Sequence, residues 1–212
     1  MILAQQQRQA LCDTALAVGP DAPTLCSPWL VKDLVSHLVI RERRPDTLPG
    51  IGVSAFAGHT DKVQDEFAAR EFADLVALVR QGPPKWAPTA IPAVDNAINT
   101  AEFVIHHEDI RRAQPDWAPG EMASQTEQGV WDSLKRIAKI SYRQAPTGVV
   151  LVAPGYGRML AHRPSAGRAS VVLTGAPVEL IMHAFGRTGV AQVDITGNEA
   201  DVAALVDSER KA

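Results

Sequence analysis

The sequence is poor in cysteine: Cys12 and Cys26 are the two among 212 residues. Two cysteines cannot form the disulfide framework of a small secreted domain. They do not form a CxxC pair either, and neither has a histidine beside it in the sequence. We therefore interpret both as free thiols that are mostly buried.

Long hydrophobic runs and a strong net charge are also missing. No stretch of about 18 apolar residues occurs, which argues against a membrane span. Arg8 and Asp13 interrupt the apolar residues near the N-terminus, so we find no secretion signal and expect a soluble, cytoplasmic protein. The net charge of −3 gives no basis for a nucleic-acid or membrane partner.

Hydrophobic residues make up 46% of the chain, which is enough for one sizeable core and a small second one. Their periodicity changes near Pro146. Before it, apolar residues recur at helical spacing; after it, short β-branched runs alternate with glycines. We therefore predict a mainly α protein with an antiparallel four-helix bundle over residues 1–145. A small α+β domain, residues 146–212, would dock on the bundle.

Local start and stop signals give the bounds of the predicted elements. Gly19-Pro20 ends the first helix, and Ser124-x-x-Glu127 resembles a capping box that opens the last helix of the bundle. Pro154-Gly155-Tyr156-Gly157 is typical of a hairpin turn. The predicted helices are 3–18, 30–44, 60–81 (bent near Arg70), 93–114, 124–144, 177–187 and 199–209. The predicted strands are 148–153, 158–162, 169–173 and 192–196.

The helix over 93–114 carries the strongest functional pattern. Glu102 and His106 are four residues apart, Asp109 follows three residues later, and all three project within about 60° of one another. Ile98 and Ile105 flank them, which places the polar groups at the edge of the apolar face. A metal ion would satisfy a buried carboxylate and imidazole there. A solvated Glu–His pair on the outer face of the helix is the alternative.

His37 borders the apolar stripe of the helix over 30–44. A single histidine at such a place is usually a core or edge residue. Together with Glu102 and His106, however, it would complete a set of two imidazoles and one carboxylate. This set suits zinc or another divalent metal and leaves one position open for water or substrate, as in catalytic sites. Asp109 fits an outer acceptor that orients an imidazole.

The chain resembles the DinB-like superfamily, and within it the branch of mycothiol-dependent maleylpyruvate isomerase, whose relatives are actinobacterial proteins. The resemblance is carried by Trp29, by Asp33-Leu34-x-x-His37-Leu38 and by Glu102-x-x-x-His106-x-x-Asp109. It implies a divalent metal, commonly zinc, held by His37, Glu102 and His106. It also implies mycothiol as a thiol cofactor, and a role for Arg187 in binding cofactor or substrate. A cation at a helix C-terminus is the alternative for Arg187.

The expected function is thus transfer or isomerisation of a small electrophilic substrate by a metal-activated low-molecular-weight thiol. A metal-dependent hydrolase that activates water and a non-catalytic metal-binding protein are the alternatives. Asn99, one turn before Glu102, could line the pocket. Arg41, together with Arg43 and Arg44, could bind a carboxylate or other anion near the pocket mouth. The alternative for Asn99 is a solvated helix residue. The alternative for Arg41 is a cation in the last turn of a helix. An oligomer is compatible with the sequence.

Overall fold

The structure is a computed structural model that describes residues 2–47, 57–118, 120 and 122–208. The chain divides into two compact units, Met1–Pro119 and Gly120–Ala212. The sequence predicts the boundary later, between residues 145 and 146. The helix predicted over 124–144 therefore belongs to the second unit and not to the first. Within the described ranges, no helix has the length and hydrophobicity needed to cross a membrane.

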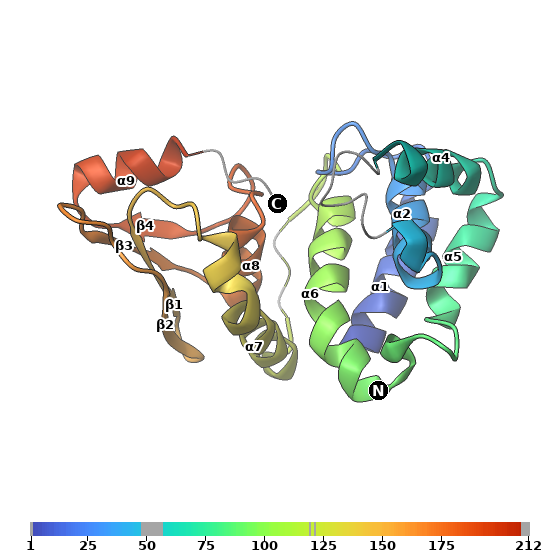
Figure 1. Cartoon of the computed structure of the whole chain (residues 1–212), viewed down its shortest axis with the longest axis horizontal. Coiled ribbons are helices and arrows are strands. Elements are labelled where there is room, and N and C mark those ends of the chain that lie inside the picture. The colour runs from blue at the N-terminus through green and yellow to red at the C-terminus, as the bar shows by residue number, and fades with distance from the viewer. Residues whose placement is uncertain (1, 48–56, 119, 121, 209–212) are drawn as a thin grey trace. The chain divides into compact units, whose positions relative to one another are not determined.

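The first unit is helical and contains the candidate site. Its core is formed by large apolar side chains, among them Leu11, Leu34, Leu38 and Phe103, each at most 1% exposed. The first and last helices of the unit pack against each other, and the second packs on the two shorter helices (Figure 1). The elements are α1 (Leu3–Val18), α2 (Val31–Arg43), η1 (Pro45–Thr47), α4 (Ala57–Ala68), α5 (Phe72–Gln81), η3 (Pro88–Ala90) and α6 (Pro92–Arg111).

The helix predicted over 60–81 is two helices in the structure. Helix α4 ends at Ala68, and Glu71 then takes an extended backbone conformation, with φ −61° and ψ 132°, as the N-cap of α5. Leu75, Val76 and Val79 of α5 are buried. The break therefore lets α5 turn its apolar face into the core independently of α4. At the predicted bend near Arg70, the structure therefore has a break between two separate helices.

Among its described residues, the second unit combines three helices with a mixed four-stranded sheet in the order β2-β1-β3-β4. Strand β1 is antiparallel to β2 and parallel to β3, and β4 is antiparallel to β3. Ala153 pairs with Gly157, which confirms the predicted hairpin. Helices α7 and α8 lie side by side, and α9 packs against β3 (Figure 1). The elements are α7 (Ser124–Ser141), β1 (Gly148–Ala153), β2 (Gly157–His162), β3 (Ser170–Thr174), α8 (Pro177–Ala184), β4 (Asp194–Thr196) and α9 (Glu199–Val206).

Helix α7, expected in the bundle, packs within the second unit against α8 and β2. The hydroxyl of Tyr156 donates a hydrogen bond to the Glu127 carboxylate, and the Tyr142 hydroxyl lies 2.8 Å from His183 Nδ1. The capping-box prediction is wrong, because Ala123 is the N-cap and Glu127 is engaged by Tyr156. The mainly α class with a small sheet is confirmed. Docking of the tail on the bundle stays a prediction.

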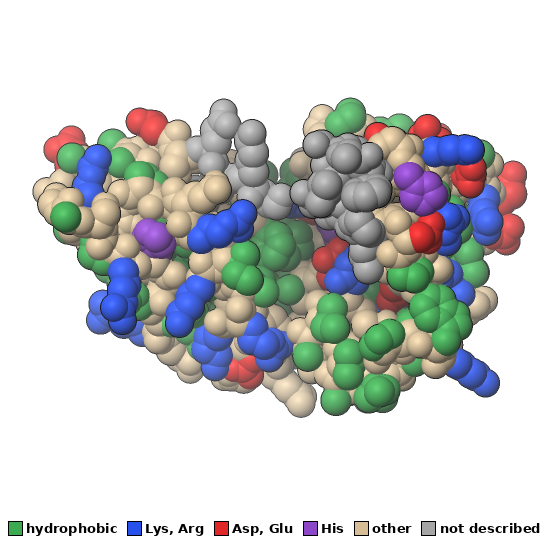
Figure 2. Space-filling model, in the orientation of Figure 1, with side chains coloured by type: hydrophobic (Ala, Val, Ile, Leu, Met, Phe, Trp, Pro, Cys, Tyr) green, Lys and Arg blue, Asp and Glu red, His purple; other side chains and the backbone are tan. Residues whose placement is uncertain are grey.

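The N-terminal part of α6 and the segment before it expose large hydrophobic side chains: Trp86 is 64% exposed, Ile91 58% and Ile98 50%. Figure 2 shows hydrophobic side chains gathered over this end of the first unit. Ile105, by contrast, is 3% exposed. The spacing of Ile98 and Ile105 predicted that both lie on the apolar face of α6. This prediction is wrong for Ile98, which is exposed. The buried face of this helix is carried by polar residues in its first half.

Candidate metal centre

His37 on α2 and the pair Glu102 and His106 on α6 converge on one point. His37 Nε2 lies 3.5 Å from Glu102 Oε1, and His106 Nε2 lies 3.4 Å from the same oxygen. The rings of His37 and His106 meet edge to face with their centroids 5.5 Å apart. The structure thus brings together the three residues that the sequence selects, at a place that is only partly shielded from solvent.

The spacing of these atoms fits a divalent ion. Two ligand atoms of a tetrahedral zinc site lie about 3.3 Å apart when each is about 2.0–2.1 Å from the ion. The nitrogen–oxygen separations at this site are 3.4 and 3.5 Å, and the three donor atoms all lie within 4.8 Å of one another. Two imidazoles and one carboxylate are also the donor types that zinc prefers. The residues present therefore fit the metal that the resemblance implies.

Asp109 lies on the other side of the His106 ring. Its Oδ2 is 3.0 Å from His106 Nδ1, and its side chain is fully buried. A carboxylate at Nδ1 fixes the ring orientation and holds the proton on Nδ1, which directs the lone pair of Nε2 toward the point where the donors meet. This is the geometry expected of an outer acceptor. It separates Asp109 from the three candidate ligands.

The local charges favour the ionised forms of the pair. Burial by itself raises the pKa of Glu102, but hydrogen bonds with His106 and His37 and the charge of Arg41 outweigh it, so the pKa lies well below its ordinary value. Burial likewise lowers the pKa of His106, yet Asp109, Cys26 and Glu102 together raise it well above its ordinary value, so a metal at Nε2 would displace the proton that this nitrogen carries in the metal-free site. Glu102 is therefore a carboxylate at neutral pH, the form in which it binds metals.

Arg41 and Asn99 connect the site to the core. Arg41 Nε lies 3.2 Å from Glu102 Oε1, and Arg41 Nη1 donates to Asn99 Oδ1 at 2.5 Å. Asn99 is fully buried, and its amide donates to Asp95 Oδ1 at 2.7 Å. Both residues predicted near the pocket are thus beside the site. Asn99 is fully buried and supports Arg41 from within the core.

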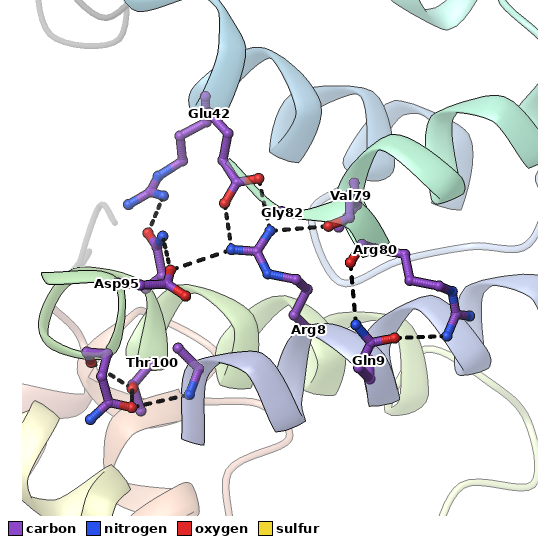
Figure 3. A network of polar contacts seen from close by, with 12 residues as sticks. Arg8, Gln9, Glu42, Val79, Arg80, Gly82, Asp95 and Thr100 are labelled. Carbon is purple, nitrogen blue, oxygen red and sulfur yellow. Dashed lines mark hydrogen bonds and ion pairs between the residues drawn. The ribbon is translucent and has the colours of Figure 1, made fainter. Parts of the chain in front are cut away.

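The core end of this chain of contacts is a buried ion cluster (Figure 3). Arg8 of α1 binds both carboxylate oxygens of Glu42, at 2.6 and 2.8 Å, and contacts Asp95 at 3.3 Å. The Arg8 and Glu42 side chains are 2% and 3% exposed. The guanidinium also stacks over the Phe103 ring at 4.2 Å. Although α1 carries none of the candidate ligands, it thereby fixes a chain of contacts that reaches Glu102.

Other residues near the ligands or in the second unit have other partners. His107, next to His106 in the sequence, contacts the Thr14 hydroxyl at 2.9 Å. Arg43 donates to the carbonyls of Leu78 and Gly82. Arg187 belongs to the second unit, where its guanidinium donates to the Phe185 carbonyl just after α8. Arg187 therefore lies just past the C-terminal end of α8, and its role in binding cofactor or substrate stays a prediction.

Cys26 is the residue that sequence reasoning missed. Its thiol donates to Asp109 Oδ2 at 3.0 Å and lies 3.9 Å from His106 Nδ1. The partners are 83 and 80 residues away in the sequence, so no spacing pattern could reveal the contact. Trp29, from the same loop, packs on His37 with ring centroids 5.2 Å apart. The presence of Trp29 in the motif that carries the resemblance is the signal that pointed to this loop.

Cys12, in contrast, behaves as the buried thiol that the sequence predicts. It is 1% exposed, and burial raises its pKa from 9.0 to about 11. Because the folded-state pKa is the higher one, the unfolded chain loses this proton first as the pH rises. The contribution of the neutral thiol to stability is therefore complete below pH 9 and is lost between about pH 9 and 11, by about 2–3 kcal/mol.

A comparison of the wild type with Cys12→Ala, by urea unfolding from neutral pH to pH 11, tests this dependence on pH. The free energy of unfolding of the wild type should fall toward that of the variant as the pH rises. The difference cancels the titration of lysines and tyrosines common to both chains. A constant difference across the range would contradict the shifted pKa of Cys12.

The fold and the site together define a class: a helical unit with a His–Glu–His donor cluster, followed by a small α/β unit with a four-stranded sheet. A solved structure with this fold is the mycothiol-dependent maleylpyruvate isomerase, at a TM-score of 0.57 and 14% sequence identity, covering 92% of this chain and 90% of that chain. A histidine-to-alanine mutant of that enzyme matches with the same TM-score and coverage at 13% identity.

The predicted resemblance to the mycothiol-dependent maleylpyruvate isomerase branch is therefore confirmed at the level of the fold. No protein-family model matches the sequence, and no curated protein sequence matches it. The structural likeness covers nearly the whole of both chains. The order of helical unit and α/β unit is thus common to the two proteins.

Proposed function

We propose that this protein is a zinc-dependent enzyme that uses a low-molecular-weight thiol, mycothiol, to transfer or isomerise a small electrophilic substrate. The observation that carries the proposal is the convergence of His37, Glu102 and His106 with ligand-like spacing. The fold likeness to a mycothiol-dependent isomerase supports the choice of thiol. The proposal of a metal is thus based on the donor residues, and the proposal of a thiol cofactor is based on the likeness in fold.

His37, Glu102 and His106 would hold the metal as its three protein ligands. Three ligands leave a position for an exogenous molecule, which distinguishes a catalytic site from a closed structural one. A divalent metal in such a site makes a coordinated thiol a thiolate at neutral pH. None of the three side chains is fully buried, with exposures between 13% and 21%, so a small molecule can reach the site from solvent.

The residues around the ligands control their orientation and charge. Asp109 keeps the Nδ1 proton of His106 and leaves Nε2 free to bind. Arg41 holds the Glu102 carboxylate and balances part of its charge, while Asn99 holds Arg41. Arg187 in the second unit is proposed to bind the thiol cofactor or the substrate. Arg187 is a half-buried residue, and a guanidinium suits a carboxylate.

Binding of mycothiol to the full-length protein tests the thiol half of this proposal. We expect calorimetric titration to show binding to zinc-loaded protein and a loss of more than about tenfold in affinity for the metal-free protein, since the thiolate needs the ion. The S-methylated thiol, which cannot ionise, is the matched ligand control and should bind as weakly as mycothiol binds the metal-free protein.

Three outcomes would contradict the thiol proposal. Equal binding of mycothiol and its S-methyl form would show that the sulfur does not meet the metal. Turnover of esters or amides by the zinc-loaded protein without thiol would show a hydrolase. Zinc that binds tightly and admits neither thiol nor substrate would show a non-catalytic metal site.

A further inference from the structure

The Nδ1 side of His106 holds a second group of metal-binding atoms, distinct from the group at Nε2. It consists of Cys26 Sγ, His106 Nδ1 and Asp109 Oδ2, which all lie within 4.8 Å of one another. The two groups share only the imidazole of His106, each using one of its nitrogens. The second group adds a sulfur, which the first one lacks.

The separations in this second group match a small ion. Asp109 Oδ2 is 3.0 Å from Cys26 Sγ and 3.0 Å from His106 Nδ1, and the remaining separation is 3.9 Å. A point equidistant from the three atoms is about 2.0 Å from each, which is close to the zinc bond lengths of about 2.0–2.3 Å to oxygen, nitrogen and sulfur. A slightly larger ion fits after a small displacement out of their plane.

The loop that carries Cys26 is fixed in place by hydrogen bonds. The Leu25 amide donates to the Asp109 carbonyl at 3.0 Å, which joins the loop to α6. Within the loop, the Cys26 amide donates to the Thr24 hydroxyl at 3.1 Å, and the Trp29 amide donates to the Cys26 carbonyl at 3.0 Å. The thiol is thus positioned by backbone contacts that do not depend on the thiol itself.

We propose that Cys26, His106 and Asp109 form a second metal-binding position, selective for thiophilic ions such as cadmium. A thiolate is a soft ligand and favours such ions over magnesium or calcium, whereas the His37–Glu102–His106 set contains nitrogen and oxygen donors alone. The side chain of Cys26 is partly exposed, so an ion has access to it. The thiol proton is released to solvent when the ion binds.

Occupation of the second position has a consequence for the first. A neutral imidazole carries one proton, and an ion at Nδ1 requires that proton to be at Nε2. Nε2 then has no lone pair for an ion held by His37 and Glu102. The two positions therefore compete for His106, and a thiophilic ion at Cys26 removes zinc from the first position. This inference is independent of the thiol chemistry proposed above.

Titration of the metal-free full-length chain with cadmium chloride tests the second position. The readout is the ultraviolet charge-transfer absorption of a cadmium–thiolate bond. We expect the wild type to show this band. The band should stop growing when one cadmium has bound to the Cys26 thiol of each chain. Cys12→Ala, which leaves Cys26 as the one thiol of the chain, should give the same band.

Cys26→Ser should lose the band and lower cadmium affinity by more than the ~10–100-fold that follows removal of an outer-shell partner. His37→Ala should weaken zinc binding and keep the cadmium–thiolate band, because His37 belongs to the first position alone. Prior addition of cadmium to the wild type should reduce zinc uptake.

Two results would overturn the second position: cadmium binding to the wild type without the band, or a band that persists in Cys26→Ser. The failure of the proposed function is recognisable separately. A chain that binds no zinc at neutral pH but gives a Cys26-dependent cadmium band lacks the first position and retains the second.

Discussion

His106→Ala is expected to abolish stoichiometric zinc binding. The variant loses one of three candidate protein ligands and leaves Asp109 without the ring that it orients. Removal of an outer-shell partner alone costs about 10–100-fold in metal affinity, and loss of a ligand costs more. The affinity should therefore fall by well over ~100-fold. Equilibrium dialysis against zinc, with metal content measured by atomic emission and competition by a chelator, gives the ratio.

His162→Ala is the matched control for this experiment. His162 ends strand β2 in the second unit and takes part in neither metal-binding group of the described residues. Its removal should leave one zinc per chain. Circular dichroism of His106→Ala shows whether the variant is folded. A wild-type chain without zinc, or a folded His106→Ala chain that retains wild-type affinity, would refute the assignment of the site.

The second large effect concerns the buried ion cluster beneath the site. Arg8→Met is expected to lower the free energy of unfolding by about 3–5 kcal/mol, because it leaves Glu42 and Asp95 buried without their cation. Methionine fills much of the volume of the arginine stem, so the loss reports charge more than a cavity. Urea unfolding at neutral pH, followed by tryptophan fluorescence, measures the change.

Arg80→Met provides the contrast for Arg8→Met. Arg80 binds Asp13 at 2.6 Å, but its side chain is 36% exposed and that of Asp13 is 70% exposed. An exposed ion pair contributes about 0–1 kcal/mol, so the same substitution here should change stability by no more than that. Equal losses in the two variants would show that the Arg8 cluster is no more important than a surface pair.

Much of the secondary structure could be predicted because its signals are local. Helix α1 has the predicted bounds, since Gly19 at φ 89° ends it. Strand β1 also has them, followed by a turn whose glycine takes a positive φ. The unit to which α7 belongs could not be predicted in this way. An amphipathic helix indicates that it has a buried face, but the pattern does not indicate which core buries that face.

In the candidate site, too, local relations could be predicted and contacts between distant segments could not. The relation of Glu102, His106 and Asp109 follows from the geometry of one helix, so spacing was sufficient. His37 lies on another helix, and its place beside Glu102 came from the resemblance. Cys26 was missed because a backbone hydrogen bond from Leu25 brings its loop to α6. Such a contact between distant segments leaves no period in the sequence.

The chain of contacts from Arg8 through Asp95, Asn99 and Arg41 to Glu102 has a thermodynamic consequence. Small zinc domains often fold only when the metal binds, so the ion supplies their folding free energy. Here the donor side chains are aligned by a core that is complete without an ion. Metal uptake would therefore be binding to a preorganised receptor, with little conformational entropy lost, and the metal-free protein would keep its fold.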